Sequence, residues 1–135
     1  MDTSLESYAR SIVVALATML LIACSSEQMA SGPNVVARWQ TCRDSTGGPT
    51  NHTALENVGW TEGKLIINVK DNDYCGGTRV ANPRFTVSGD RLQLSWTWEL
   101  GPEKSVTACA CDHALRFELS NVPAGDYKVQ LARTR

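Results

Sequence analysis

The chain has 135 residues, and its 13 Lys and Arg residues nearly balance its 14 Asp and Glu residues. The formal net charge is −1 at pH 7, whereas proteins that bind nucleic acids or anionic surfaces usually carry a clear basic excess. The composition therefore argues against a nucleic-acid partner. A chain of this length is expected to form one domain of common size.

The N-terminal region has the pattern of an export signal. Arg10 precedes an uninterrupted apolar run from Ile12 to Ala23. A membrane-spanning helix needs about 20 apolar residues, and this run is clearly shorter. It therefore fits the hydrophobic core of a signal peptide better than a transmembrane anchor.

The apolar run ends in Leu21-Ile22-Ala23-Cys24, which resembles the lipobox of bacterial lipoproteins. The resemblance implies that Cys24 carries a diacylglycerol thioether and, after cleavage, an acyl chain such as palmitate on its amine. Ser25 resembles the residue that sorts such proteins to the outer membrane in enteric bacteria. We therefore expect a protein of the bacterial cell envelope, held at the outer membrane by its lipid anchor. The alternative is an ordinary secretory signal that happens to end at a cysteine.

The sequence divides into three expected segments. Residues 1–23 form the signal peptide, residues 24–34 the lipidated cysteine with a flexible tether, and residues 35–135 the folded domain. The tether "SSEQMASGPN" consists of small and polar residues with a Gly-Pro break, a composition typical of a flexible linker.

The folded domain shows apolar residues with a period of two, which is typical of half-buried β-strands. The clearest example is "RLQLSWTWEL" from Arg91 to Leu100, where Leu and Trp alternate with polar residues. The other predicted strands are Asn34–Cys42, Lys64–Lys70, Arg84–Val87, Ser105–Cys111, Ala114–Leu119 and Tyr127–Ala132. About seven short strands predict an all-β fold, an antiparallel β-sandwich or a small barrel, and the sandwich is preferred.

Polar, Gly and Pro residues between these strands predict the turns. Asp71-Asn72-Asp73 is interpreted as a hairpin turn, because the pattern lacks the terminal glutamate of an EF-hand calcium loop. Arg43–Gly63 is interpreted as a long loop, in which Thr53–Val58 could form a turn of helix.

The C-terminal stretch "LSNVPAGDYKVQL" contains Val122, Pro123, Gly125 and Tyr127. It resembles the tyrosine corner of fibronectin type III domains and the corresponding turn of prealbumin-like, carboxypeptidase-regulatory-like sandwiches. The resemblance implies an immunoglobulin-like or prealbumin-like β-sandwich, in which the phenol of Tyr127 bonds back to nearby backbone. It implies nothing about activity.

Four cysteines remain once Cys24 carries the lipid: Cys42, Cys75, Cys109 and Cys111. An even number in an exported protein favours disulfides. Cys109 and Cys111 lie two residues apart, which places both side chains on one face of a strand and disfavours a bond between them. We therefore expect each of the two to pair with either Cys42 or Cys75, and the sequence leaves open which pairing forms. A redox pair is a weaker alternative, because such pairs are more often Cys-x-x-Cys beside a helix.

Two other hypotheses use the same region of the chain. Cys109, Cys111 and His113 alternate along one predicted strand and could together bind copper or zinc. An enzyme would depend on His52 or His113, but neither histidine lies in a recognisable catalytic motif. The disulfide interpretation is preferred to both, and it predicts no cofactor, no metal and no enzymatic activity.

Trp60 is the residue best suited to contact a ligand, because it lies between Gly59 and Thr61 in the predicted loop. Trp39, Trp96 and Trp98 instead share the apolar faces of their strands and are predicted to pack in the core. The working surface is expected on the loops at one end of the domain, above all Ser45–Gly63. The function expected from the sequence is non-enzymatic binding or a structural role in the envelope, with an envelope protein or a glycan as partner.

Overall fold

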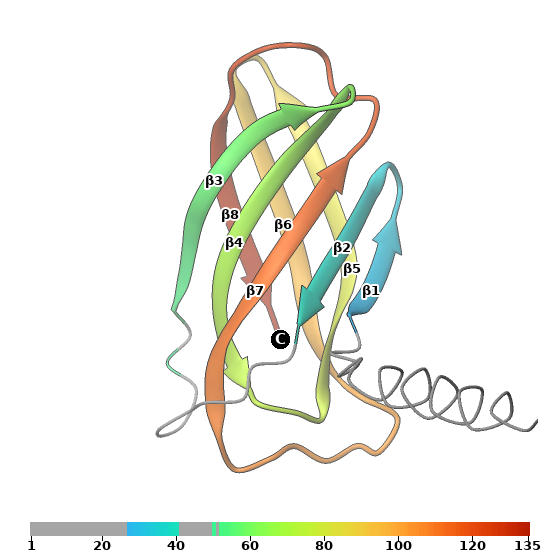
Figure 1. Ribbon diagram of the computed structural model, residues 1–135, viewed down its shortest axis with the longest axis vertical. Coiled ribbons are helices and arrows are strands. Elements are labelled where there is room, and N and C mark those ends of the chain that lie inside the picture. Colours follow the sequence, from blue (N-terminus) through green and yellow to red (C-terminus); the bar gives the residue numbers. More distant parts are fainter. Residues whose placement is uncertain (1–26, 41–49, 51) are drawn as a thin grey trace, which may run out of the picture.

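The structure is a computed structural model that describes residues 27–40, 50 and 52–135. The predicted signal peptide, Cys24, Ser25 and Cys42 lie outside these residues. The described chain consists of strands, turns and irregular segments arranged in two sheets (Figure 1). It contains no helix long and apolar enough to cross a membrane.

Eight strands make up the described part of the fold, where about seven had been predicted. They are β1 Gln28–Gly32, β2 Val35–Gln40, β3 Thr53–Thr61, β4 Lys64–Tyr74, β5 Thr78–Ser88, β6 Arg91–Leu100, β7 Ala110–Leu119 and β8 Lys128–Thr134. One sheet has the order β1-β2-β7-β4-β3, and the other has the order β5-β6-β8. All neighbours are antiparallel except β6 and β8, which are parallel. The predicted all-β class is confirmed, and the parallel pair makes the smaller sheet mixed.

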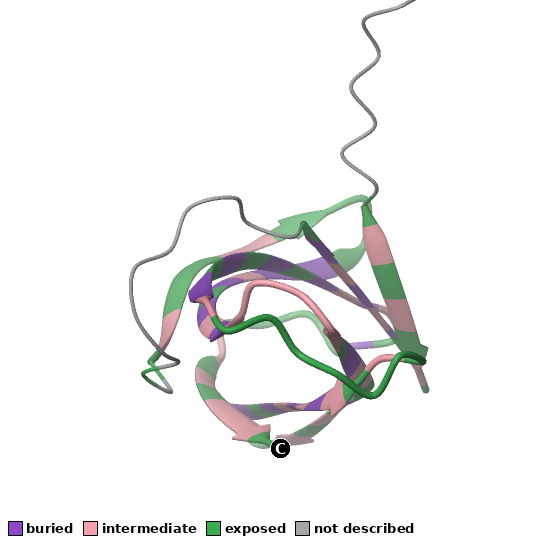
Figure 2. Cartoon of the chain, turned by 90° about the horizontal axis from the view of Figure 1, so that it is seen from below, coloured by how far each residue is buried: buried purple, intermediate pink, exposed green. Residues whose placement is uncertain are grey.

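The two sheets face each other and enclose a single core, as the view along the strands shows (Figure 2). β1 passes close to β5, where Gly32 meets the backbone of Pro83. A Cβ atom at position 32 would lie 1.9 Å from the carbonyl oxygen of Pro83. This close approach requires glycine at the position, because any side chain would push the two sheets apart.

The core is built from the inward positions of the alternating strands. In β6, Leu92, Leu94, Trp96 and Trp98 are all buried. The rings of Trp39 and Trp98 meet edge to face with centroids 6.3 Å apart. The rest of the core comes mainly from β2, β4 and β7: Val35, Ala37, Leu65, Ile67, Val69, Leu115, Phe117 and Leu119. The predicted burial of the three tryptophans is thus confirmed.

The sheet begins earlier than the sequence predicted, because part of the expected tether forms β1. Gln28–Gly32 pairs with β2 through a tight turn at Pro33 and Asn34. Asn34 has a φ of 57°, a left-handed conformation that asparagine tolerates and that a turn with proline at the preceding position can require. The Gly-Pro pair is therefore part of a hairpin rather than of a linker.

Three other sequence-based assignments were wrong. Asp71-Asn72-Asp73 is not a turn, since β4 continues to Tyr74 and pairs with β7 over that length. Thr53–Val58 is not helical, since Thr53–Thr61 forms the edge strand β3 beside β4, with a bulge between Leu55 and Asn57. The predicted strands Ser105–Cys111 and Ala114–Leu119 are one strand, β7, which begins at Ala110. In β4 and β7, pairing with a strand distant in sequence overrides the local turn composition, and in β3 the same effect comes from the hairpin with β4, the next strand.

The tyrosine corner forms as the sequence predicted. Tyr127 donates its hydroxyl hydrogen to the carbonyl oxygen of Pro123 at 2.6 Å. Trp60 donates its indole N–H to the carbonyl oxygen of Gly125 at 3.2 Å. The two bonds hold the loop between β7 and β8 at the end of the domain that lies at the top of Figure 1, and this end is called the upper end below.

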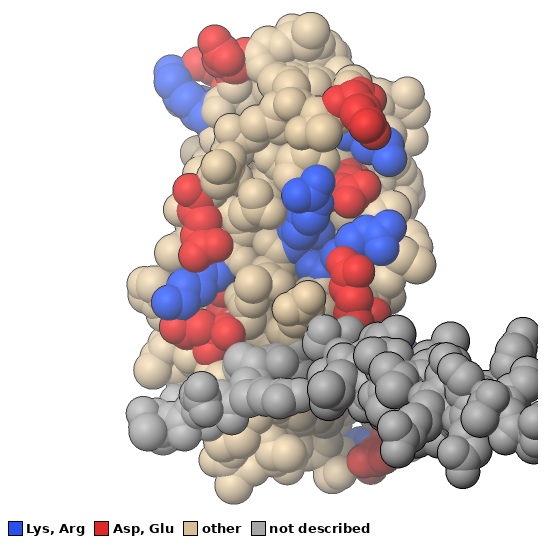
Figure 3. Space-filling view, viewed as in Figure 1, with Lys and Arg blue, Asp and Glu red and all other residues tan. Residues whose placement is uncertain are grey.

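The outer face of the five-stranded sheet carries charges of both signs side by side (Figure 3). Glu118 lies within 4 Å of three cationic groups, those of Arg116 (3.3 Å), Arg38 (3.5 Å) and Lys64 (3.7 Å). Burial alone would raise the pKa of Glu118, but the hydrogen bond from Arg116 and the surrounding positive charges hold it below its ordinary value. This cluster joins β2, β4 and β7 across their outer face.

Candidate functional site

Two carboxylates are buried where β4 reaches the end of the domain opposite the upper end. Asp71 and Asp73 are both fully buried, with no exposed fraction. They continue the inward row of Leu65, Ile67 and Val69, because alternate residues of a strand point to the same face. This end, which carries Tyr74–Thr78 and Leu100–Cys109, is called the lower end.

Asp71 joins the two sheets through its side chain. Its Oδ2 accepts hydrogen bonds from the indole N–H groups of Trp96 (3.0 Å) and Trp98 (2.6 Å) on the facing sheet. Its Oδ1 accepts from the hydroxyl of Thr53 at 2.6 Å. The Nε of Arg133 on β8 lies 3.3 Å from Oδ2. Hydrogen bonds of this number and kind can stabilise a carboxylate in the core.

Asp73 is engaged on one oxygen and unpartnered on the other. Its Oδ1 accepts from the Nη2 atoms of Arg133 (3.1 Å) and Arg135 (2.5 Å). Its Oδ2 is buried and has no hydrogen-bond partner among the described residues. A buried oxygen without a donor is costly, and such groups often mark a place where a ligand or water completes the bonding.

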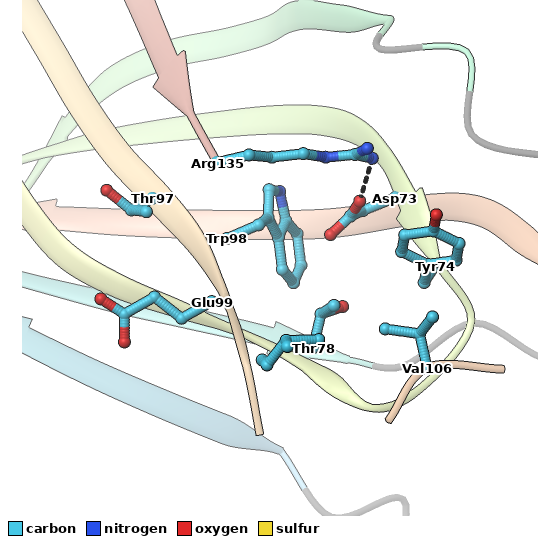
Figure 4. A pocket seen from close by; sticks show the side chains of 9 residues that line it. Asp73, Tyr74, Thr78, Thr97, Trp98, Glu99, Val106 and Arg135 are labelled. Atoms are coloured by element: carbon cyan, nitrogen blue, oxygen red, sulfur yellow. Dashed lines mark hydrogen bonds and ion pairs between the residues drawn. The ribbon is translucent and has the colours of Figure 1, made fainter. Parts of the chain in front are cut away.

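A pocket of about 390 Å³ opens beside Asp73 at the lower end (Figure 4). It forms because β8 ends at Thr134, which pairs with Thr97, so that the last residues of β6 extend beyond their neighbour. The pocket is lined by Asp73, Tyr74, Thr78, Thr97, Trp98, Glu99, Leu100, Val106 and Arg135. Its volume lies within the range of small-molecule sites.

The lining combines aromatic and aliphatic surface with a few polar groups. Trp98 lies in the middle of the view in Figure 4, and Arg135 extends above it toward Asp73 and Tyr74. The guanidinium carbon of Arg135 lies 5.3 Å from the centre of the Tyr74 ring. Thr78 contributes a buried hydroxyl that has no hydrogen-bond partner within the described chain. Leu100, with 53% of its surface exposed, contributes apolar surface toward solvent.

A disulfide holds the loop at the mouth of the pocket. Cys75, next to Tyr74, is bonded to Cys109, which precedes β7. The backbone N–H of Cys75 also donates to the carbonyl oxygen of Cys109 at 3.0 Å, and Thr107 donates to Gly76 at 3.2 Å. The segment that carries Val106 is therefore fixed against the turn after β4.

His113 lies in the core beside this pocket. It is 2% exposed, and its Nε2 lies 2.9 Å from the carbonyl oxygen of Tyr74. Its ring centre is 4.9 Å from that of Trp98. Its Nδ1 has no hydrogen-bond partner in the described part of the chain. His113 therefore packs behind the pocket and does not line it.

The structure answers part of the question of how the cysteines pair. Of the expected pairings, the structure forms the bond between Cys75 and Cys109. Cys111 is buried and is also disulfide-bonded, while Cys42, its predicted candidate partner, lies outside the described residues. The hypothetical metal site required free thiols at Cys109 and Cys111, and both sulfurs are engaged in disulfides. Among the described residues, no three His, Cys, Asp or Glu side chains are arranged to hold a metal ion.

Trp60, the predicted ligand contact, lies away from the pocket. It is 40% exposed and lies on β3 near the upper end, where it bonds to Gly125. The predicted working loop, Ser45–Gly63, is partly outside the described residues, and most of its second half is β3. The structure therefore brings Trp60 together with the tyrosine corner and not with the cysteine-rich end.

Four residues of the site are absent from the sequence-based predictions: Asp71, Asp73, Arg133 and Arg135. The sequence contains one signal for the two aspartates: they continue the alternation of inward-facing residues along β4 by two further positions. The polar composition of Asp71-Asn72-Asp73 instead favours a turn. The arginine partners of Asp73 are Arg133 on β8 and Arg135 just after it, at sequence separations of 60 and 62, and nothing local indicates that pairing.

The fold and the site together define a small all-β, two-sheet domain with a disulfide and a ligand-sized pocket at one end. No protein-family model, curated protein or solved structure matches the chain. The functional argument therefore depends on the chemistry of the pocket itself.

Proposed function

We propose that this protein is a lipid-anchored, non-enzymatic binding protein of the bacterial cell envelope, and that its ligand binds in the pocket at the lower end. The observation that carries the proposal is the buried Oδ2 of Asp73, which lacks a partner among the described residues of a pocket large enough for a small ligand. An envelope protein or a glycan is the class of partner that the sequence favours.

The polar groups of the pocket favour recognition over catalysis. Asp73 is bound by two arginines. Glu99 lies 3.7 Å from Arg79 and accepts a hydrogen bond from Asn82 at 3.0 Å. Carboxylates held by several donors are fixed in orientation, which suits a binding site, whereas a general base must give and take a proton during each turnover.

The sequence supports the membrane attachment and the sandwich fold. Leu21-Ile22-Ala23-Cys24 provides the lipobox pattern, and Ser25 favours the outer membrane. The bond between Tyr127 and Pro123 supports an immunoglobulin-like or prealbumin-like β-sandwich. In this proposal, the tether between Cys24 and β1 separates the domain from the membrane.

Anchoring is tested by changing Cys24 to Ser in the bacterial host. The wild-type chain should incorporate labelled palmitate and fractionate with membranes, while Cys24→Ser should lose the label and enter the soluble fraction. The same chain with Cys42→Ser is the matched control, because it also removes one thiol but leaves the lipobox intact. Label on Cys24→Ser, or none on the wild type, would disprove lipid attachment at this residue.

Ligand binding is tested by NMR with a library of small fragments against the full chain in a neutral detergent. Binding in the pocket should shift the indole resonance of Trp98 more than that of Trp60. Thr78→Phe fills the pocket and should abolish these shifts, whereas Thr86→Phe makes the same change at an exposed position of the same strand and should preserve them. Shifts confined to Trp60, or no shifts with any fragment, would disprove the proposed site.

A further inference from the structure

The charged side chains that meet beside the pocket have a net charge of zero only when Arg135 is included. Asp71 and Asp73 contribute two buried negative charges, and Arg133, whose side chain is 9% exposed, contributes one buried positive charge. The remaining negative charge is balanced by Arg135. An unbalanced charge in a buried site is unfavourable, so a cation is favoured at this position.

Arg135 is the least enclosed member of this group. Its side chain is 41% exposed, against 9% for Arg133 and none for the two aspartates. It follows Thr134, the last residue of β8, so no strand pairing fixes its backbone. A cation in this setting can be withdrawn without disrupting the sheet.

The place that the guanidinium occupies has the chemistry of a cation-recognition site. On one side is the Asp73 carboxylate, which accepts from Nη2. On another is the face of Tyr74, with the guanidinium carbon 5.3 Å from the ring centre, within the range of a cation–π contact. The Trp98 ring and the second Asp73 oxygen, which has no partner within the described chain, lie beside it in Figure 4.

From these observations we propose that the pocket binds the guanidinium or alkylammonium group of an organic cation, and that Arg135 occupies this position until the ligand displaces it. The inference rests on the proposed binding function and specifies its ligand class. Displacement leaves the buried charge balanced, because one cation replaces another. The unpartnered Oδ2 of Asp73 and the hydroxyl of Thr78 provide acceptors for the additional N–H groups of such a ligand.

The test compares two probes of the same shape and different charge, phenylguanidine and phenylurea. Phenylguanidine is a cation at neutral pH, and phenylurea is neutral. Each is titrated into the full chain while the Trp98 indole resonance is followed. Arg135→Ala should bind phenylguanidine about tenfold more tightly than the wild type, because a tethered competitor has been removed. Arg84→Ala, which removes an exposed arginine of β5, should bind like the wild type.

The double variant Arg135→Ala/Asp73→Asn tests the charge directly. It retains one buried carboxylate, Asp71, and one buried guanidinium, Arg133, so its core remains balanced and the variant is expected to fold. It should bind phenylguanidine and phenylurea equally. If Arg135→Ala already bound the two probes equally, the inference of a cationic ligand would be overturned, but the pocket would still be a binding site. If neither probe nor any fragment shifted Trp98, the proposed function would fail as well.

Two sources could supply such a cation, and a blocked peptide distinguishes them. The guanidinium of Arg135 is presented at the end of an extended strand, as an arginine in an extended polypeptide would present it. If N-acetyl-Ala-Arg-Ala-amide binds Arg135→Ala more tightly than phenylguanidine does, the cation belongs to a polypeptide. If the peptide binds more weakly, the site accepts a small amine or guanidine. Both results support the cation class, and failure of both cations overturns it.

Discussion

Trp98 donates its indole N–H to Oδ2 of Asp71 at 2.6 Å, and this bond connects β6 of one sheet with β4 of the other. Trp96 donates to the same oxygen at 3.0 Å. The core of this small domain is thus not purely apolar: the sheets are joined by a buried carboxylate that two indoles and an arginine surround. The pocket lies directly beside this junction, so the residues that hold the sheets together also form its wall.

Replacing Asp71 with Ala should be among the most destabilising single changes in the domain. It leaves two indole donors and the Thr53 hydroxyl without their acceptor, and it removes one of the two carboxylates that Arg133 contacts. Breaking a buried ion pair by removing one partner typically costs about 3–5 kcal/mol. Urea unfolding followed by tryptophan fluorescence measures the loss.

Asp112→Ala is the matched control for this change. Its carboxylate bonds to Lys70 at 2.9 Å on the surface, with 44% of the side chain exposed, and exposed pairs contribute about 0–1 kcal/mol. Similar losses of stability for the two variants would show that Asp71 does not have the structural role argued here.

The sequence predicted the strands whose patterns are local. Arg91–Leu100 was assigned with its observed bounds, because its apolar residues alternate without a break and turn residues lie just before and just after it. The tyrosine corner was also predictable, since Pro123 and Tyr127 are only four residues apart. In both cases, the interactions that decide the structure lie within a short window of sequence.

The buried polar residues could not be assigned in the same way. Polar composition normally favours turns, and at Asp71 and Asp73 this preference is overridden by tryptophan and arginine partners at separations of 25 to 62 residues. β1 was missed for a different reason: the sequence Gln-Met-Ala-Ser-Gly shows no clear alternation of apolar and polar residues, and it forms a strand through its hairpin with β2. The pocket depends on where β8 ends relative to β6, which is a property of the assembled sheets.

The bond between Cys75 and Cys109 should contribute substantially to stability, because it closes a loop with a sequence separation of 34. The chain-entropy estimate for a loop of this length is about 4 kcal/mol, and measured values are usually about 2–4 kcal/mol. The double variant Cys75→Ala/Cys109→Ala should therefore unfold at a distinctly lower urea concentration. The variant is preferable to a reducing agent, since Cys111 is disulfide-bonded as well. Unfolding at the wild-type urea concentration would contradict the prediction.

Tyr127→Phe should reduce stability by about 1 kcal/mol, since it removes one hydrogen bond and keeps the ring. The lost bond is the one from the Tyr127 hydroxyl to Pro123. Trp60→Phe removes the longer, exposed bond to Gly125 in the same loop and should cost less. Thermal unfolding of the two variants checks this order. A larger loss for Trp60→Phe would show that Trp60, rather than the tyrosine corner, holds the loop between β7 and β8.

Glu118 should make the stability of the sheet depend on pH in the acid range. Because its pKa is held below its ordinary value, the folded state favours the ionised form more than the unfolded state does. The resulting stabilisation is present above the unfolded pKa of about 4.3, and it is lost as the pH falls through the lower, folded pKa. Glu118→Gln lacks this contribution at every pH.

The difference in unfolding free energy between the wild type and Glu118→Gln should therefore be largest near neutral pH and should disappear in strong acid. Urea titrations at a series of pH values measure it. Glu103→Gln, at an exposed position of the loop after β6, controls for the change of net charge and should follow the wild type. A difference that remained constant down to about pH 2, well below the ordinary carboxyl pKa, would mean that Glu118 acts through packing rather than through its charge. The three cations within 4 Å of its carboxylate favour the electrostatic explanation.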